Sequence, residues 1–349
     1  MDLRTLNITP ELMNITSEID EFNGGWKVQN NLDPDFLTHL QHVATIESIG
    51  SSTRIEGAKL SDSEIESLLG EVNKQSFANR DQQEVVGYSE IMATIFANFR
   101  FIDVTENYVK QLHASLLRHS DKDIRHRGEY KKHTNSVEAF TKTGESLGVV
   151  FETTSAFDTP KEMQDLIYWV RESLGDKSVH PLLVIAIFNV VFLAIHPFQD
   201  GNGRLSRALV SLLMLKSGYC YIPYTSLESI IEKNKDSYYL SLQRTQKTLK
   251  SDTDWLPWLL FFFRSLKRQK DHLQLKTSLV ERYSHLPKES VIIMQYLEKN
   301  NRITIAEASK IITTISKPSV KNRLAGLVKQ GLIMRHGKAR ATWYSIAPS

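Results

Sequence analysis

The stretch His196-Pro-Phe-Gln-Asp-Gly-Asn-Gly-Arg-Leu-Ser-Arg207 decides the fold around it in this chain of 349 residues. An apolar run at 182–195 precedes the stretch and has the length of a buried helix. Leucines follow it at helical spacing, at positions 205, 209, 212 and 213. We therefore expect two helices joined by a tight loop, with the glycines of the stretch opening the second helix.

The groups in this loop are suited to binding a polyphosphate. Backbone N–H groups at a helix N-terminus form an anion site that carries roughly half a positive charge, and glycine lets the main chain approach a ligand closely. Arg204 and Arg207 can add guanidinium groups, whose paired N–H donors fit phosphate oxygens. His196 supplies an imidazole, which is suited to accepting a proton near neutral pH. Asp200 supplies the single carboxylate that a hard divalent cation uses beside phosphate oxygens and water.

Each of these residues also has an ordinary structural interpretation. A histidine at a helix end is commonly a cap or a core residue, and an Asp-Gly-Asn-Gly segment alone is commonly a turn. Two arginines one turn apart commonly lie on a solvated helix face. All of these features together, in this order, favour a nucleotide site.

The motif HPFQDGNGRLSR resembles the signature of the Fic family, His-Pro-Phe-x-Asp/Glu-Gly-Asn-Gly-Arg-x-x-Arg, at every fixed position. Most members with this pattern are adenylyltransferases, which move AMP from ATP to a side-chain hydroxyl (Tyr, Ser or Thr) of a protein and release pyrophosphate. The resemblance implies that His196 is the general base and that Asp200 holds Mg²⁺ or Mn²⁺. It also implies that the ATP phosphates are bound by Gly201, Asn202, Gly203, Arg204 and Arg207.

A second motif, Ser52-Thr-Arg-Ile-Glu56-Gly57, resembles the Fic inhibitory pattern Ser/Thr-x-x-x-Glu-Gly/Asn. Ser52 and Glu56 are four residues apart and share one helix face. Asp33-Pro34 predicts the start of that helix, and Gly50 and Gly57 are both candidate ends.

The resemblance implies that Glu56 pairs with Arg207 and occupies the space that the γ-phosphate needs. An inhibitory preference of ~3 kcal/mol would leave under about one per cent of the protein competent. The alternative is that Glu56 is a surface residue before a C-capping glycine.

Two further features border the predicted site. Residues 133–140 and 149–152, with a polar turn at 142–146 between them, predict a β-hairpin. In the Fic family a hairpin flap at this place aligns an extended segment of the target by strand addition; a purely structural hairpin is the alternative. Tyr238-Tyr239 resembles a weaker family pattern, which makes Tyr239 a candidate nucleotide contact, with a core aromatic pair as the alternative.

The composition is that of an ordinary globular protein, with 41% hydrophobic and 24% charged residues. Cys220 is the only cysteine, which excludes an intramolecular disulfide framework and favours a reducing compartment. The N-terminus lacks the apolar core of a secretory signal, and the apolar run at 182–195 is too short to span a bilayer. We expect a cytoplasmic protein without membrane contact.

The C-terminal region differs from the rest in charge. Residues 286–349 hold 11 Lys/Arg and 3 Asp/Glu, a net charge of about +8, whereas the remainder carries about −5. A capping box at Thr304, a helix beginning near Pro318 and ending before Gly331, and two short β segments predict a winged helix-turn-helix. Lys317, Lys321 and Arg323 near the start of its second helix would suit phosphate contacts with DNA. Docking to a protein is the alternative.

The sequence therefore predicts a mainly α fold, with a Fic-type helical core, a hairpin flap and a winged helix-turn-helix. The expected domains are an N-terminal helical region at 1–104, a catalytic core at 105–270 and the winged domain at 271–349. The expected function is an autoinhibited protein adenylyltransferase acting on a target hydroxyl. Alternatives are a DNA-binding regulator whose Fic fold senses nucleotides, and removal of AMP by the same site. The sequence is also compatible with a homodimer.

Overall fold

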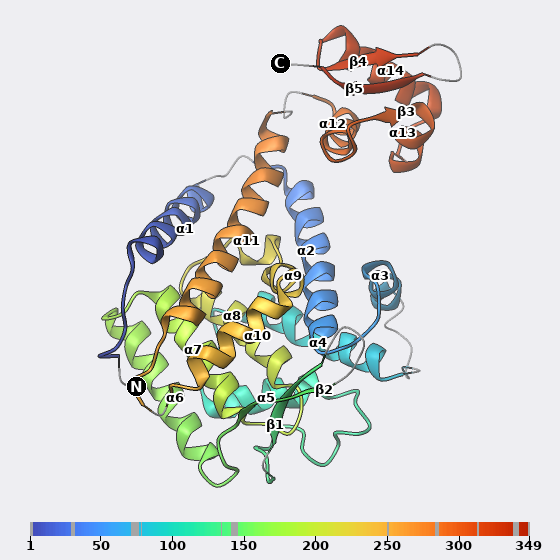
Figure 1. Cartoon of the computed structure of the whole chain (residues 1–349). Coiled ribbons are helices and arrows are strands. Elements are labelled where there is room, and N and C mark those ends of the chain that lie inside the picture. Colours follow the sequence, from blue (N-terminus) through green and yellow to red (C-terminus); the bar gives the residue numbers. More distant parts are fainter. Residues whose placement is uncertain are drawn as a thin grey trace. The chain divides into compact units, whose positions relative to one another are not determined.

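The computed structural model describes residues 3–28, 32–70, 77, 79–133, 135–140, 146–249, 251–282, 286–312, 314–337 and 342–347. The chain forms two compact units, residues 1–271 and 272–349. The predicted regions 1–104 and 105–270 both fall in the first unit. The described elements are mainly helices, which confirms the predicted fold class (Figure 1).

Helix α7 (Pro181–Ile195) is the centre of the larger unit. Its sequence is apolar almost throughout, Pro181 occupies the first turn, and most of its side chains are buried. It packs against α6 (Thr159–Asp176), α8 (Asn202–Lys216) and α10 (Lys235–Gln246). Trp258 of α11 (Leu256–Arg282) is fully buried and donates its indole N–H to the carbonyl of Ala186 at 2.7 Å. The predicted helix–loop–helix around the motif is confirmed.

The helix that carries the second motif is α2 (Pro34–Ile55). It begins as predicted, with Asp33 as N-cap accepting from the N–H of Asp35 at 2.8 Å. It passes through Gly50 without a break and ends at Glu56, after which Gly57 takes a φ of +106°. Of the two candidate ends, Gly57 is therefore the one that terminates the helix. The helix packs against α4 (Arg80–Asn98), α9 (Leu227–Lys233) and η1 (Ile222–Tyr224).

The predicted hairpin is present as β1 (Ser136–Phe140) and β2 (Ser146–Glu152), which pair antiparallel. The register pairs Ser136 with Glu152 and shifts irregularly towards the turn. Residues 142–145 of the predicted polar turn lie outside the described residues. The remaining helices of the larger unit are α1 (Pro10–Val28), α3 (Asp62–Gly70) and α5 (Glu106–Leu116).

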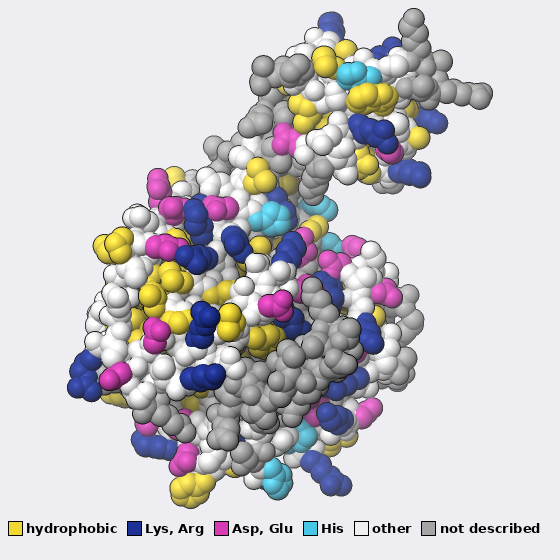
Figure 2. Space-filling view, in the orientation of Figure 1, with side chains coloured by type: hydrophobic (Ala, Val, Ile, Leu, Met, Phe, Trp, Pro, Cys, Tyr) yellow, Lys and Arg dark blue, Asp and Glu magenta, His cyan; other side chains and the backbone are white. Residues whose placement is uncertain are grey.

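Helix α11 begins at Leu256 and continues to Arg282. No helix in the described part of the chain is long and apolar enough to cross a membrane. On the face drawn in Figure 2, basic and acidic side chains of the larger unit are interspersed rather than gathered by sign.

The smaller unit contains α12 (Lys288–Asn300), α13 (Ile305–Ile311) and α14 (Lys317–Lys329) with a three-stranded antiparallel sheet. Its strands β3 (Ile303–Thr304), β4 (Ile333–His336) and β5 (Trp343–Ile346) lie in the order β3-β5-β4. The capping box predicted at Thr304 is confirmed. The helices and the sheet enclose a separate apolar core.

Candidate active site

His196 lies at the C-terminal end of α7, where the loop begins. Its backbone is left-handed, with φ 51° and ψ 60°, and its N–H donates to the carbonyl of Phe192 at 2.9 Å. Its ring Nδ1 lies 3.3 Å from the carbonyl of Leu193, which can only accept, so Nδ1 is the protonated nitrogen of the neutral ring. Burial lowers the pKa of His196 to about 4. The ring is therefore neutral near pH 7, with the lone pair on Nε2.

The side chain of Asn202 fixes the shape of the loop. Its Oδ1 accepts from the N–H of Phe198 at 2.9 Å and its Nδ2 donates to the carbonyl of the same residue at 2.7 Å. Phe198 is fully buried in the core. Gly201 takes a φ of +79° and ends the loop, and α8 begins at Asn202 as predicted.

His113 of α5 packs against the loop, and this role was not predicted from the sequence. Its ring stacks on Phe198 with 3.8 Å between ring centroids. Its Nε2 donates to the carbonyl of Asp200 at 3.0 Å, while its Nδ1 accepts from the N–H of Gly128 at 2.9 Å. Because both contacts come from residues far apart in the chain, no local pattern could have identified this histidine.

Asp200 and Arg204 belong to one buried charge network. Asp200 Oδ1 accepts from Gly201 N–H at 2.6 Å and from Arg204 at 3.2 Å, and Oδ2 accepts from Arg80 at 3.2 Å. Burial alone would raise the pKa of Asp200, but Arg204 and the other cations hold it below its ordinary value. Arg204 is 1% exposed, and its guanidinium also lies 3.1 Å from Glu84. The structure thus places Arg204 among carboxylates rather than towards an open anion site.

Arg207 is held by the residues of the second motif. Its Nε donates to Oγ of Ser52 at 2.9 Å and its Nη2 to the carbonyl of Ser52 at 2.9 Å. Nη2 also forms an ion pair with Oε1 of Glu56 at 2.7 Å. The Arg207 side chain is 3% exposed, whereas that of Glu56 is 32% exposed. Within the described part of the chain, the buried Nη1 of Arg207 has no hydrogen-bond partner.

The carboxylate of Glu56 lies against the first turn of α8. A β-carbon at Gly203 would collide with Oε1 of Glu56 and would lie 3.3 Å from Nη1 of Arg207. Glycine at this position therefore lets the carboxylate of Glu56 approach the backbone of α8 closely. Burial alone would raise the pKa of Glu56, but Arg207 lowers it below its ordinary value. An ionised carboxylate thus lies beside the first turn of α8, an end of the helix that favours negative charge.

The last turn of α2 is anchored by Arg54. The guanidinium forms two hydrogen bonds with Glu232 of α9, at 2.7 and 3.1 Å, and one with Asp62 of α3 at 2.9 Å. These bonds fix the direction in which the neighbouring Glu56 leaves the helix.

The tyrosine pair borders the same place. Tyr238 is buried and packs edge-on against Trp258 with 5.9 Å between ring centroids, as a core aromatic does. Tyr239 is partly exposed and lies 5.1 Å from Tyr238. Burial raises the pKa of Tyr239, and Glu56 adds to the rise because of its negative charge. Burial and the charge of Glu56 raise the pKa of Tyr238 as well, so the two tyrosines differ in exposure: Tyr238 lies in the core and Tyr239 is partly exposed.

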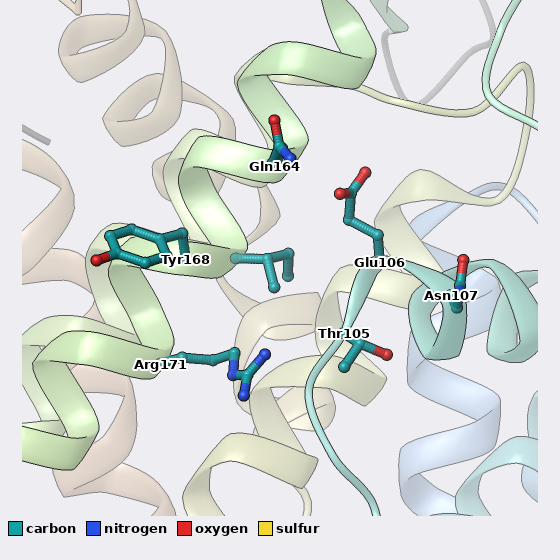
Figure 3. Close-up of a pocket in the computed structure, with 7 residues that line it drawn as sticks. Thr105, Glu106, Asn107, Gln164, Tyr168 and Arg171 are labelled. Carbon is teal, nitrogen blue, oxygen red and sulfur yellow. The ribbon is translucent and has the colours of Figure 1, made fainter.

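A separate surface pocket of about 300 Å³ contains none of the predicted site residues. Gln164, Tyr168 and Arg171 of α6 face Thr105 and Glu106 at the start of α5 across it (Figure 3). Its link to the loop is indirect, because Glu106 accepts a hydrogen bond from Tyr130 at 2.9 Å, and the Tyr130 ring lies 5.5 Å from that of Phe198.

Comparison with known proteins identifies the domain that contains this loop. Residues 103–214 match the Fic/DOC family. The chain is 24% identical over 325 residues to proteins named protein adenylyltransferase Fic from Drosophila melanogaster and Drosophila sechellia. The match covers 93% of this chain and 56% of each relative, so the chain spans about half the length of these relatives.

Solved structures share the fold. A Fic family protein from Desulfovibrio desulfuricans G20 matches with a TM-score of 0.62 at 22% identity, covering 99% of this chain and 98% of that one. Fic-1 from C. elegans matches with a TM-score of 0.57 at 19% identity, covering 76% of this chain and 72% of that one. The loop His196–Arg207 lies inside the region 103–214 that matches the Fic/DOC family, and the chain shares the fold of these solved Fic structures.

Proposed function

We propose that this protein is a protein adenylyltransferase that moves AMP from ATP to a hydroxyl side chain of a target protein and is inhibited by its own Glu56. The observation that carries the proposal is the ionised carboxylate of Glu56, paired with Arg207 at 2.7 Å against the first turn of α8. This place is built to bind an anion, and in the resting protein an anion from the chain itself is bound there.

The residues present suffice for the transfer step. A hydroxyl oxygen of the target attacks the α-phosphorus of ATP, its proton passes to Nε2 of His196, and the bond to pyrophosphate breaks. His196 suits this role because its ring is neutral and Nδ1 is committed to the carbonyl of Leu193. The negative charge that develops on the phosphate oxygens would be met by the backbone N–H groups of Gly201, Asn202 and Gly203.

Arg207 is the better placed of the two arginines to bind phosphate. Its buried Nη1 lies beside Gly203. Nη1 of Arg207 and Nε and Nη1 of Arg204 all have no hydrogen-bond partner among the described residues, so the two arginines differ in their surroundings rather than in spare donors. Arg204 is engaged with Asp200 and Glu84, and its charge would act mainly through Asp200. This division refines the expectation that both arginines hold phosphates.

The residues fit a divalent cation bound mainly by the substrate. Among the described residues no group of three or more His, Cys, Asp or Glu side chains forms a metal cluster. Asp200 supplies one ionised carboxylate, 26% exposed, at the edge of the loop. Mg²⁺ is commonly held by one or two carboxylates together with phosphate oxygens and water, so Asp200 would hold Mg²⁺ or Mn²⁺ beside ATP. The ion would neutralise part of the charge on the phosphates.

The target would lie along the hairpin. A hairpin with a free edge can bind an extended segment of another protein through main-chain hydrogen bonds. The roots of β1 and β2 are attached to the loop that carries His196, so a segment bound there would bring its hydroxyl near the base.

The test is the transfer of label from each of the four α-labelled nucleoside triphosphates, with and without a cell lysate. Glu56→Gly is expected to raise automodification by roughly 10²-fold, because it removes a competing anion worth ~3 kcal/mol. Glu66→Gly, which removes an exposed carboxylate from α3, is the matched control and should leave the rate unchanged. If neither the native protein nor Glu56→Gly transfers label from any nucleotide, the proposal is wrong.

A second candidate function concerns the smaller unit. Lys317 and Lys321 are exposed on α14, while Arg323 lies 3.3 Å from Glu289. Together with the net charge of about +8 over 286–349, these lysines support DNA binding by a winged helix. Salt-dependent retardation of duplex DNA, lost in Lys317→Glu/Lys321→Glu, would support it. Retardation that is absent at low salt, or unchanged in that variant, would point to protein docking instead.

A further inference from the structure

A buried lysine contacts the residue that precedes His196, and the proposed transfer step does not involve it. Lys131 is 3% exposed. Its ammonium donates to Oδ1 of Asn135 at 2.9 Å, to Oγ1 of Thr153 at 2.8 Å and to the carbonyl of Ile195 at 2.9 Å. Three acceptors match the three N–H donors of an ammonium group. Burying a lysine costs free energy unless such partners are supplied. The three acceptors therefore stabilise the ammonium group in its buried position.

The partners of Lys131 come from three places that must act together. Asn135 directly precedes β1, and Thr153 directly follows β2, so they are the two roots of the hairpin. Ile195 directly precedes His196. One side chain therefore connects both ends of the hairpin to the residue before the base.

Other hydrogen bonds repeat the same connection. The N–H of Lys131 donates to the carbonyl of Pro197 at 2.8 Å, and Nδ2 of Asn135 donates to that of Phe198 at 2.9 Å. The N–H of Thr154 donates to the carbonyl of Ala194 at 3.3 Å. Lys131, Asn135 and Thr154 thus donate together to the carbonyls of residues 194, 195, 197 and 198. Only His196, whose backbone is left-handed, is left between these attachments.

We propose that Lys131 is a positioning residue that joins both roots of the β1–β2 hairpin to the backbone on either side of His196, so that the base and the segment aligned on the hairpin move as one body. The proposal rests on the proposed function. It adds that the register between the acceptor hydroxyl and Nε2 is set by this ammonium rather than by the hairpin alone. A displacement of about 1 Å between reacting groups can cost roughly 10²-fold in rate.

The charge of Lys131 has a second effect on His196. Burial is the main reason for the lowered pKa of His196, and the nearby positive charge of Lys131 lowers it further. Glu56 and Asp200 act in the opposite direction, because their negative charges raise the pKa of the ring. Removing the ammonium is therefore expected to raise the pKa of His196. Burial in turn lowers the pKa of Lys131 to about 8, so its own charge is sensitive to its surroundings.

The experiment compares Lys131→Met and Lys131→Arg in the Glu56→Gly background. Lys132→Met is the matched control, because Lys132 is the next residue and is exposed. For Lys131→Met we expect kcat to fall by roughly 10- to 100-fold with KM for ATP nearly unchanged, and the acidic limb of the kcat/KM profile to move to higher pH. Lys131→Arg keeps the charge and should keep the acidic limb in place.

A second measurement separates this proposal from the proposed function. Backbone hydrogen exchange of residues 193–198 and of the hairpin roots should be faster in Lys131→Met than in Lys132→Met. Where Lys131→Met fails to fold, Thr153→Val removes one acceptor and should give a smaller increase at the same segments. Equal exchange, kcat and acidic limb in the variants of Lys131 and Lys132 would overturn the role of Lys131. Absence of transfer in Glu56→Gly itself would overturn the proposed function, while the exchange result would still decide whether Lys131 joins loop and hairpin.

Discussion

Two carboxylates meet the first turn of α8, and the protein holds them in different ways. Asp200 belongs to the loop itself. Its Oδ1 is bound by Gly201 and Arg204, its neighbours in the sequence, and its Oδ2 by Arg80 of α4. Glu56 comes from the end of α2, 151 residues from its partner Arg207. The contacts of Asp200 Oδ1 form whenever the loop forms, whereas the pairing of Glu56 depends entirely on the docking of one helix against another.

Under the proposed function, this difference separates a scaffold, the loop with Asp200, from a switch, the Glu56–Arg207 pair. The bonds around Asp200 define the loop, so a ligand must adapt to them. Under the proposed function, the carboxylate of Glu56 takes the place of a phosphate, so a ligand that binds Arg207 would compete with it. A change at the scaffold should lower transfer, and a change at the switch should raise it.

The largest effect is expected at His196. In the Glu56→Gly background, His196→Ala should lower the transfer rate by roughly 10²- to 10⁴-fold, the usual contribution of a general base. Binding of ATP, measured by calorimetry, should remain within a few-fold, because the anion site on α8 is intact. A double variant that keeps the rate of Glu56→Gly would show that His196 is not the base.

The same isosteric change in the two carboxylates should act in opposite directions. Asp200→Asn in the Glu56→Gly background should lower transfer by roughly 10- to 100-fold, because loss of a residue at a metal site commonly costs this much. Glu56→Gln in the otherwise native chain should raise transfer by about tenfold, less than Glu56→Gly, because the amide still accepts a hydrogen bond from Arg207 but carries no charge. Initial rates over a range of Mg²⁺ concentrations measure both. Two changes of the same sign would break the distinction between scaffold and switch.

The scaffold was predictable because its signals are local. The apolar run before His196, the positive-φ glycine at 201 and the leucines after the motif each act within a few residues, and they predicted the two helices and the loop. The start of α2 at Asp33-Pro34 was predictable for the same reason. The sequence left the end of α2 open between Gly50 and Gly57, and the helix continues through Gly50. A glycine within a helix costs only about 1 kcal/mol, which packing readily overrides.

The supporting residues were not predictable, because their partners are distant. His113 touches Asp200 and Phe198 across more than eighty residues, and Glu84 reaches Arg204 from α4. Lys131 reads in the sequence as one of several lysines before the hairpin, and only the fold shows that it is buried. The sequence predicted that Arg204 and Arg207 both bind phosphate, but it could not show that Arg204 lies against Asp200 and Glu84 and Arg207 against Glu56.

Within the scaffold, Asn202→Ala should lower stability rather than only activity. The change removes both hydrogen bonds to the buried backbone of Phe198 and leaves its N–H group without a partner. The free energy of unfolding should fall by about 1–3 kcal/mol. Denaturant unfolding of the variant measures this. An unchanged midpoint would mean that His113 and Asn135 hold Phe198 without Asn202.

The smallest effect is expected at Ser52, on the switch. Ser52→Ala removes the hydroxyl that accepts from Nε of Arg207 at 2.9 Å, while the carbonyl of residue 52 still accepts from Nη2. The guanidinium is then held less firmly towards Glu56, and a loss of about 1 kcal/mol in that pairing corresponds to a rise in automodification of about fivefold. Ser48→Ala, one turn earlier in the same buried face of α2, is the matched control. A fall in transfer for Ser52→Ala would instead mean that Ser52 orients Arg207 for the nucleotide, and that this serine belongs to the scaffold although it lies on the same helix as Glu56.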